Sequence, residues 1–339
     1  MRAAQLVRIG DPDRAFRLCE LPDPVPGPAE VVIDVEAFGL NFADVMARIG
    51  VYPDAPALPC VLGYEVVGRI AEVGAEVTCW RGGERVVAFT RFGGYATRAV
   101  TPATACARIP DEMDACEATM LPTQFGTAVF CAEEMVKLRP GDAVLVQAAA
   151  GGVGTGLVQL CKEAGCVVFG TASGAKIDHL HALGVDHPID YRHDDFEEVV
   201  RSVVGARGLD VVFDSIGGSS VKKGRRLLGA GGRIVCFGAA QQAGPRRSVL
   251  RAANMAMRFG VHHPIDLMMR SQAVIGVNML RIADDRPQWL AQLLARTVEL
   301  TARGVLRPVV GGGFPAAQLA RAHEVLGSRA SIGKVACTW

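Results

Sequence analysis

Hydrophobic and polar positions follow two different patterns along the chain. Up to about residue 123, short β-branched runs with partial alternation predict antiparallel strands, for example at 31–37 and 65–73. From about 124 to 278, short apolar runs alternate with stretches of helical spacing, which is typical of a parallel sheet with crossover helices. Two further helices, at 288–304 and 316–327, and a strand at 334–338 are expected in the tail.

These patterns predict an α/β protein with two domains. We expect a small β-rich domain, a partly closed barrel, over residues 1–123, and a doubly wound parallel sheet over 124–278. The tail, 279–339, is expected to return to the first domain, which would then be discontinuous. Strands of the parallel sheet are expected at 143–146, 167–171, 187–190, 210–214, 233–238 and 273–277.

A glycine turn joins the first of these strands to a helix. Gly151, Gly152, Val153 and Gly154 form it, with Ala149 where a first glycine usually stands. Without a Cβ at the first two glycines, a pyrophosphate can approach the backbone, and the third lets the helix pack closely on the strand. The first N–H groups of the helix would then face the phosphates. The turn therefore predicts a dinucleotide site, and the alternative is a glycine-rich loop of an ordinary α/β domain.

The residues after the second strand indicate which dinucleotide would bind. An NAD site usually has Asp or Glu about 20 residues past the glycines, bonded to the ribose 2′-hydroxyl. Here the segment 171–176 contains no acid but has hydroxyl groups and Lys176, which suit a 2′-phosphate. We therefore expect NADPH, and the alternative is that Lys176 is a solvated charge.

Composition and charge narrow the classes of function that remain. With 36 basic and 35 acidic residues, the net charge of +1 gives no reason to expect a nucleic-acid partner. The ten cysteines form no CxxC pair and indicate reduced core cysteines of a cytoplasmic protein, not disulfides or a zinc cage. No signal region precedes the first charges. The uncharged stretch 143–161 is not expected to span a membrane, because the glycine turn lies inside it.

Several segments together resemble the medium-chain dehydrogenase/reductase superfamily. Within it, the chain is most similar to the zinc-independent quinone oxidoreductase family, in the branch named for vesicle amine transport protein. The resemblance covers nearly the whole chain and rests on GLNFAD at 39–44, GYEVVG at 63–68, GERV at 83–86, AAAGGVG at 148–154, GTAS at 170–173, PIDY at 188–191 and IGKV at 332–335.

The resemblance implies a GroES-like catalytic domain, a Rossmann-type nucleotide domain and reduction of a quinone or an α,β-unsaturated carbonyl by NADPH. Zinc enzymes of the superfamily place a Cys ligand where Asn41 stands and a His ligand where Tyr64 stands. Since both ligands and the structural-zinc cysteines are missing, no metal is expected. The pair His262–His263 is interpreted as part of a loop or a helix end.

The resemblance also implies roles for individual residues. Asn41 would lie near the nicotinamide and the substrate, and Tyr52 would line the substrate pocket and donate a hydrogen bond, or a proton, to the carbonyl oxygen. Where many relatives have a second tyrosine, this chain has Met46. Expected cofactor contacts are Asn41, Thr127, Gly151, Gly152, Val153, Gly154, Ser173, Lys176, Tyr191, Phe237, Gly238 and Asn278.

Three alternative functions remain open for this chain. An enoyl-thioester reductase of the polyketide type shares many of these sequence motifs, and a non-catalytic NADPH-binding protein would share the cofactor site. A zinc alcohol dehydrogenase is the third alternative.

Residues 241–272 form a long insertion for the family, which could be a helical lid, a dimer contact or a membrane-surface helix. By analogy, a homodimer would pair the edge strands near 273–277.

Overall fold

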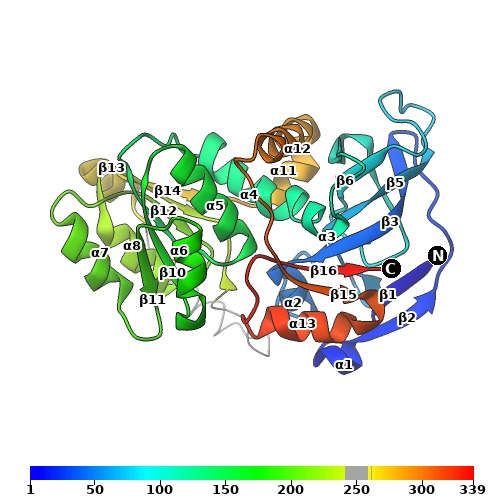
Figure 1. Cartoon of the computed structure of the whole chain (residues 1–339), viewed down its shortest axis with the longest axis horizontal. Helices are drawn as coiled ribbons and strands as arrows, with labels where there is room; N and C mark the ends of the chain where they lie inside the picture. The colour runs from blue at the N-terminus through cyan, green and yellow to red at the C-terminus, as the bar shows by residue number, and fades with distance from the viewer. Residues whose placement is uncertain (241–258, 261) are drawn as a thin grey trace.

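The computed structural model describes residues 1–240, 259–260 and 262–339. Figure 1 shows two units side by side: one contains a sheet covered by helices on both faces, and the other carries both ends of the chain. The helices α11 (Met279–Asp285) and α12 (Pro287–Ala302) lie at the top of this view, between the two units.

The first unit contains a six-stranded sheet in which every pairing is parallel. Its order is β11-β10-β9-β12-β13-β14. The strand of this sheet that comes first in the sequence, β9, therefore lies in the middle, and the strand order reverses there. This is the topology of a doubly wound dinucleotide-binding sheet, as expected. The strands are β9 (Ala143–Val146), β10 (Val167–Ala172), β11 (His187–Asp190), β12 (Leu209–Asp214), β13 (Leu228–Cys236) and β14 (Ala273–Gly276).

Apolar side chains hold the helices on this sheet. All four residues of β9 are buried, which explains why the strand reads as a continuous apolar run. Leu157, Leu160 and Cys161 recur on the buried face of α5 (Gly152–Glu163) and join the main core cluster. Among its described residues this unit also contains α6 (Ile177–Ala182), α7 (Phe196–Val204), α8 (Ser219–Leu227) and α10 (Pro264–Arg270).

The second unit is β-rich and combines both ends of the chain. The C-terminal strand β16 (Lys334–Thr338) pairs antiparallel with β3 (Glu30–Leu40), so the tail does return to the N-terminal strands. Its larger sheet has the order β15-β16-β3-β5-β6-β8, with β7 also on β3. Among the described residues the two edge strands, β15 and β8, do not pair with each other, so the sheet is open between them. The other strands here are β15 (Val310–Pro315), β5 (Glu65–Val73), β6 (Arg85–Phe89), β7 (Arg98–Pro102) and β8 (Cys106–Arg108), with a three-stranded sheet of β2 (Phe16–Glu20), β1 (Arg2–Leu6) and β4 (Cys60–Val61).

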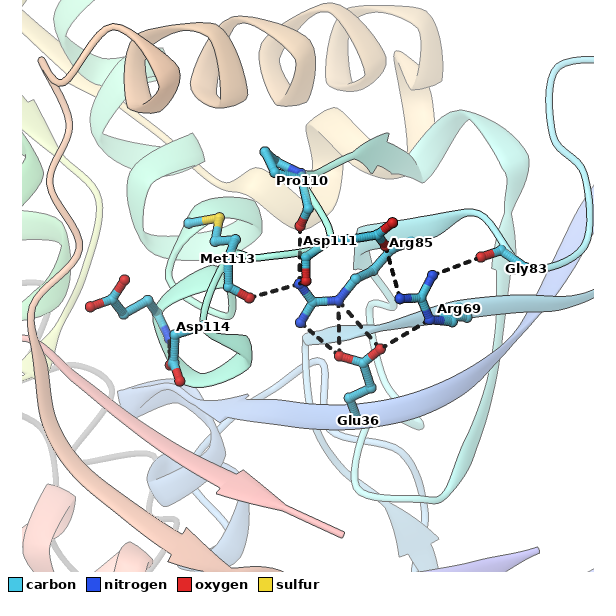
Figure 2. Close-up of polar contacts among 9 residues, drawn as sticks. Glu36, Arg69, Gly83, Arg85, Pro110, Asp111, Met113 and Asp114 are labelled. Atoms are coloured by element: carbon cyan, nitrogen blue, oxygen red, sulfur yellow. Dashed lines mark hydrogen bonds and ion pairs between the residues drawn. The ribbon is translucent and has the colours of Figure 1, made fainter.

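A buried arginine anchors the segment that leaves this unit toward the parallel sheet. Figure 2 shows the guanidinium of Arg85 between the carboxylate of Glu36 and three backbone carbonyls. Its Nη2 lies 2.7 Å from Glu36 Oε2. Its Nη1 donates to the carbonyls of Pro110, Asp111 and Met113 at 3.0, 2.9 and 2.7 Å. Because an arginine fork can satisfy several acceptors at once, this one residue fixes the turn that follows β8.

The long insertion is described only in part. Of the insertion expected at 241–272, residues 241–258 and 261 lie outside the described residues. The part that follows contains α10, on which Ile265, Met268 and Met269 are 60%, 69% and 77% exposed. Within the described residues, no helix has the length and apolar character needed to cross a bilayer.

Candidate active site

The glycine turn after β9 is built as expected, with one difference. A Cβ on Gly154 would lie 2.3 Å from the carbonyl oxygen of Ala148, so this glycine allows the close packing of helix on strand. At Gly151 the nearest atom to an added Cβ is 3.3 Å away, and the residue is half-buried. A Cβ on Gly152, however, would lie 1.8 Å from Oε1 of Gln124. Gly152 therefore makes room for a protein side chain, and Gly151 has the more open face.

The start of α5 offers the groups that an anion needs. The helix has 12 residues, and its N-cap, Gly151, has no side chain to satisfy the first N–H groups. Val153 lies in this first turn, half-buried. Free N–H groups and the helix dipole together favour a phosphate at this position. The buried Oε1 of Gln124 has no partner within the described structure, and it marks the polar wall beside the turn.

The expected 2′-phosphate residues gather at the ends of β10 and β11. Ser173 is buried directly after β10. Tyr191 follows β11 and is 46% exposed. Lys176 Nζ donates to the carbonyls of Arg329 and Ser331 at 2.8 and 2.6 Å. Burial, with the nearby guanidinium of Arg192 as a second cause, lowers the pKa of Lys176.

Arg192 is a residue that the sequence reasoning missed. It is exposed and lies close enough to Lys176 for the two cations to repel each other. Its backbone N–H donates to Oδ1 of Asp190 at 3.0 Å. Asp190 brings an acid to the end of β11, whereas the end of β10 has none. The signal for Arg192 was its place directly after Tyr191 at a strand end.

Three of the remaining expected cofactor contacts follow strands of the parallel sheet, at their carboxyl ends. Phe237 and Gly238 follow β13, and Asn278 follows β14. The Asn278 side chain accepts from the N–H of Leu280 at 3.0 Å and so caps α11. Thr127, in α4 (Gly126–Val129), is buried, and its hydroxyl donates to the carbonyl of Thr123 at 2.6 Å. The carboxyl ends of parallel strands are where ligands bind in such folds.

Asn41 lies in a buried polar network of the β-rich unit. Its Nδ2 donates to Oε1 and Oε2 of Glu65 at 2.8 and 2.9 Å. Lys334 Nζ lies 2.5 Å from Glu65 Oε1 and 3.3 Å from Asn41 Oδ1. The Lys334 and Glu65 side chains are both fully buried. Gly39 has to be glycine because a Cβ there would lie 2.1 Å from Glu65 Oε1. The side-chain amide of Asn41 is thus held inside its own domain.

A second carboxyl lies beside this network. Asp44 is at the third position of α2 (Phe42–Arg48), and it accepts from the N–H groups of Asn41 and Gly63 at 2.8 and 3.2 Å. Burial raises the pKa of Asp44 to about 7, and the charge of Glu65 adds to that effect. The network therefore has a second buried carboxyl beside it, which keeps its proton to a higher pH than an exposed aspartate does.

Tyr52 belongs to an aromatic wall. It is half-buried, and its ring meets that of Tyr64 edge-on at 6.3 Å between centroids. Phe92 continues the wall, 5.2 Å from Tyr64. Burial raises the pKa of Tyr52, so its hydroxyl keeps its proton at neutral pH and can donate it in a hydrogen bond. The neighbouring loop is tied to α11, between the two units, by Arg281, whose Nη2 lies 2.6 Å from Asp54 Oδ1.

The described residues contain no group of three or more His, Cys, Asp or Glu placed to hold a metal ion. His263 N-caps α10, where its Nδ1 accepts from the N–H of Ile265 at 3.2 Å. His262 Nδ1 lies 3.3 Å from Nη1 of Arg225. The helix-end interpretation of this pair is therefore confirmed for His263.

Comparison with known proteins shows which family the chain belongs to. The profile described as an alcohol dehydrogenase GroES-like domain matches residues 27–111, and that of a zinc-binding dehydrogenase matches 183–336. The human synaptic vesicle membrane protein VAT-1 homolog is 34% identical over 314 residues, which cover 92% of this chain and 79% of that protein. The chain therefore belongs to the medium-chain dehydrogenase/reductase superfamily, as the motifs indicated.

Solved structures agree with this assignment. Quinone oxidoreductase of Escherichia coli complexed with NADPH has a TM-score of 0.86 at 26% identity and covers 100% of both chains. CurK enoyl reductase has a TM-score of 0.85 at 26% identity and covers 99% of this chain and 98% of its own. The match to both over the full length confirms a Rossmann-type sheet joined to a GroES-like domain.

Proposed function

We propose that this protein is a zinc-independent, NADPH-dependent reductase that transfers hydride to a quinone or an α,β-unsaturated carbonyl. The observation that carries the proposal is the end of β10, where Ser173 and Lys176 stand in place of an acid and Arg192 adds a second cation. A 2′-phosphate would bring charge and acceptor oxygens to that position. The NADPH-bound quinone oxidoreductase of Escherichia coli, similar over the full chain, supports the same cofactor.

The residues present fit the cofactor. The first turn of α5 and the open face at Gly151 would hold the pyrophosphate, and Thr127 would lie toward the nicotinamide. When bound, NADPH supplies the hydride. The chain's own task is to orient the acceptor against it and to stabilise the oxygen on which negative charge develops. Tyr52, protonated at neutral pH, is the donor that we assign to this oxygen.

Replacing Tyr52 by Phe tests that assignment. We expect Y52F to lower kcat by about 100-fold, the scale of one general acid, and to leave the Kd of NADPH unchanged. Turnover of Y52F equal to that of the wild type would remove Tyr52 from the mechanism.

The substrate class is tested by NADPH oxidation with a chelator present, against quinones, simple enones and one enoyl thioester, with NADH in parallel. We expect turnover with quinones or enones and a preference for NADPH. The similarity to CurK enoyl reductase favours a second candidate, reduction of an enoyl thioester, and turnover confined to the thioester would select it. Tight NADPH binding without turnover on any of them would favour a binding protein, and loss of activity with chelator would contradict the zinc-independent mechanism.

A further inference from the structure

A segment of the C-terminal tail reaches from the β-rich unit to the nucleotide-binding unit. We call residues 329–333, between α13 (Leu319–Gly327) and β16, the strap. In Figure 1 it is the red segment to the left of β16, beside the green helices. The N–H of Gly333 donates to the carbonyl of Ala150, in the glycine turn, at 2.9 Å. Arg329 Nη2 donates to the carbonyl of Ala240, beyond β13, at 2.8 Å.

The third contact of the strap is with Lys176. Two carbonyls of the strap, those of Arg329 and Ser331, accept from the ammonium at 2.8 and 2.6 Å. An ammonium has three N–H donors and no acceptor. Two of the donors are therefore used by the strap, and one is left for a ligand. The long side chain of Lys176, which would otherwise lose much rotamer freedom when it binds a phosphate, is already held in one place.

The strap begins at the end of α13. Arg329 has a φ of +59° and follows the C-cap Ser328, the position at which a helix commonly ends in the left-handed region. Its carbonyl and its guanidinium are both bonded to the nucleotide-binding unit. The helix end therefore directs this carbonyl, one of the two that hold the ammonium, toward Lys176.

We propose that the strap positions Lys176 for the 2′-phosphate, so that discrimination between NADPH and NADH depends on backbone carbonyls supplied by the β-rich unit. The inference rests on the proposed NADPH function. In this arrangement Lys176 provides the charge, and the carbonyls of Arg329 and Ser331 keep that charge at the site. Loosening the strap should then weaken binding of the 2′-phosphate even though Lys176 is intact.

The test uses the full chain and two fragments that report only the adenosine end of the cofactor, adenosine 2′,5′-bisphosphate and adenosine 5′-monophosphate. Calorimetry gives the ratio of their Kd values. We expect K176M to lower the preference for the bisphosphate by about 10-fold or more, the scale of a charge-assisted hydrogen bond. S331G keeps the carbonyl but frees the backbone, and should lower it by about 2- to 5-fold. The double variant should be no worse than K176M alone.

The matched control is S202G, because Ser202 is an exposed serine of α7 and makes no contact with Lys176 in the structure. It should keep the wild-type preference. If S331G also keeps it while K176M loses it, the role of the strap is overturned and the NADPH function stands. If the wild type shows no preference, the proposed cofactor choice fails.

Hydrogen exchange gives a second measurement that needs no strap variant. In the wild type, the bisphosphate should slow amide exchange in residues 329–333 more than the monophosphate does, because only the bisphosphate engages Lys176. In K176M the two fragments should act alike. Equal protection of the strap by both fragments in the wild type would overturn the proposal.

Discussion

At the scale of single residues, glycines that look equivalent in the sequence have different neighbours in the structure. The turn motif predicts that Gly151 and Gly152 both clear space for a phosphate, but the space at Gly152 is filled by Gln124. Gln124 comes from a segment about 28 positions earlier, which no local pattern connects to the turn. Motif spacing can therefore predict where a glycine is needed, but the contact that requires it depends on how distant segments pack.

His323 carries a prediction about pH. It is fully buried against Tyr95, whose hydroxyl lies 3.3 Å from its Nε2. Burial, helped by the charge of Arg48, lowers the pKa of His323 to about 3. Since the unfolded histidine has a pKa of about 6.5, the unfolded state binds the proton first as pH falls. The stability that depends on neutral His323 is full above pH 6.5 and is lost toward pH 3, by up to about 1.4 kcal/mol per pH unit.

The measurement is the difference in unfolding free energy between H323Q and the wild type from pH 7.5 to 4.5, by urea denaturation. The difference isolates His323 from Asp44, whose raised pKa acts in the opposite direction because it favours the folded state as pH falls below about 7. We expect H323Q to lose less stability on acidification than the wild type. The control H181Q, at an exposed position of α6, should follow the wild type, and parallel curves for all three would contradict the prediction.

At the scale of elements, the strands that read as apolar runs were predicted well. β9, β11 and β16 have the expected bounds, and β10 and β12 differ by one residue. The start of β13 was missed because Gly229, Gly231 and Gly232 look like a loop, whereas pairing of Leu209 with Leu228 draws this segment into the sheet. An isolated glycine-rich sequence has little strand preference. Its structure here is imposed by the neighbouring strand.

Arg85 gives a prediction at this scale. Its side chain is 6% exposed and satisfies Glu36 together with three carbonyls of the turn after β8. Replacing it by Met keeps the length and removes every donor, so we expect R85M to lower the free energy of unfolding by about 2–3 kcal/mol. The change is measured from urea denaturation midpoints.

Arg69 provides the control for Arg85. It pairs with Glu36 at 3.7 Å and with Asp111 at 2.8 Å, and Figure 2 shows it beside Arg85. Its side chain is 46% exposed, so R69M should cost less than about 1 kcal/mol. An equal loss in both variants would mean that burial of Arg85 adds nothing to its role.

At the scale of the whole molecule, the candidate site combines segments that are far apart in the sequence. The triad of Asn41, Glu65 and Lys334 joins residues separated by 293 positions at most. The family resemblance placed Asn41 at the site, but it did not predict that Lys334 and Glu65 would hold its amide. No apolar period or spacing connects β16 to α2, and only the pairing of β16 with β3 brings them together.

The proposed homodimer is a further prediction at this scale. β14 is an edge of the parallel sheet, and in the described part of the chain it pairs only with β13. An unprotected edge strand is a template for pairing with another chain. The adjacent helix α10 exposes Met268 and Met269 at 69% and 77%, and their spacing from the exposed Ile265 places all three on one helix face, a grouped apolar surface of the kind that marks an interaction site. A second copy of the chain, paired edge to edge, would cover both features.

Sedimentation velocity tests this arrangement. We expect the wild type to sediment as a dimer and M268K/M269K to shift toward the monomer, because two ammonium groups would have to lose their hydration to enter the interface. The control is L18K, which places one ammonium group at a residue of β2 that is 52% exposed, in the other unit; it should stay dimeric. The thermal midpoint of M268K/M269K, measured at a concentration where the wild type is monomeric, should match that of the wild type, because the methionines contribute little to the isolated fold. A wild type that sediments as a monomer at micromolar concentration, or a dimer that is unchanged by both lysines, would contradict the edge-to-edge dimer.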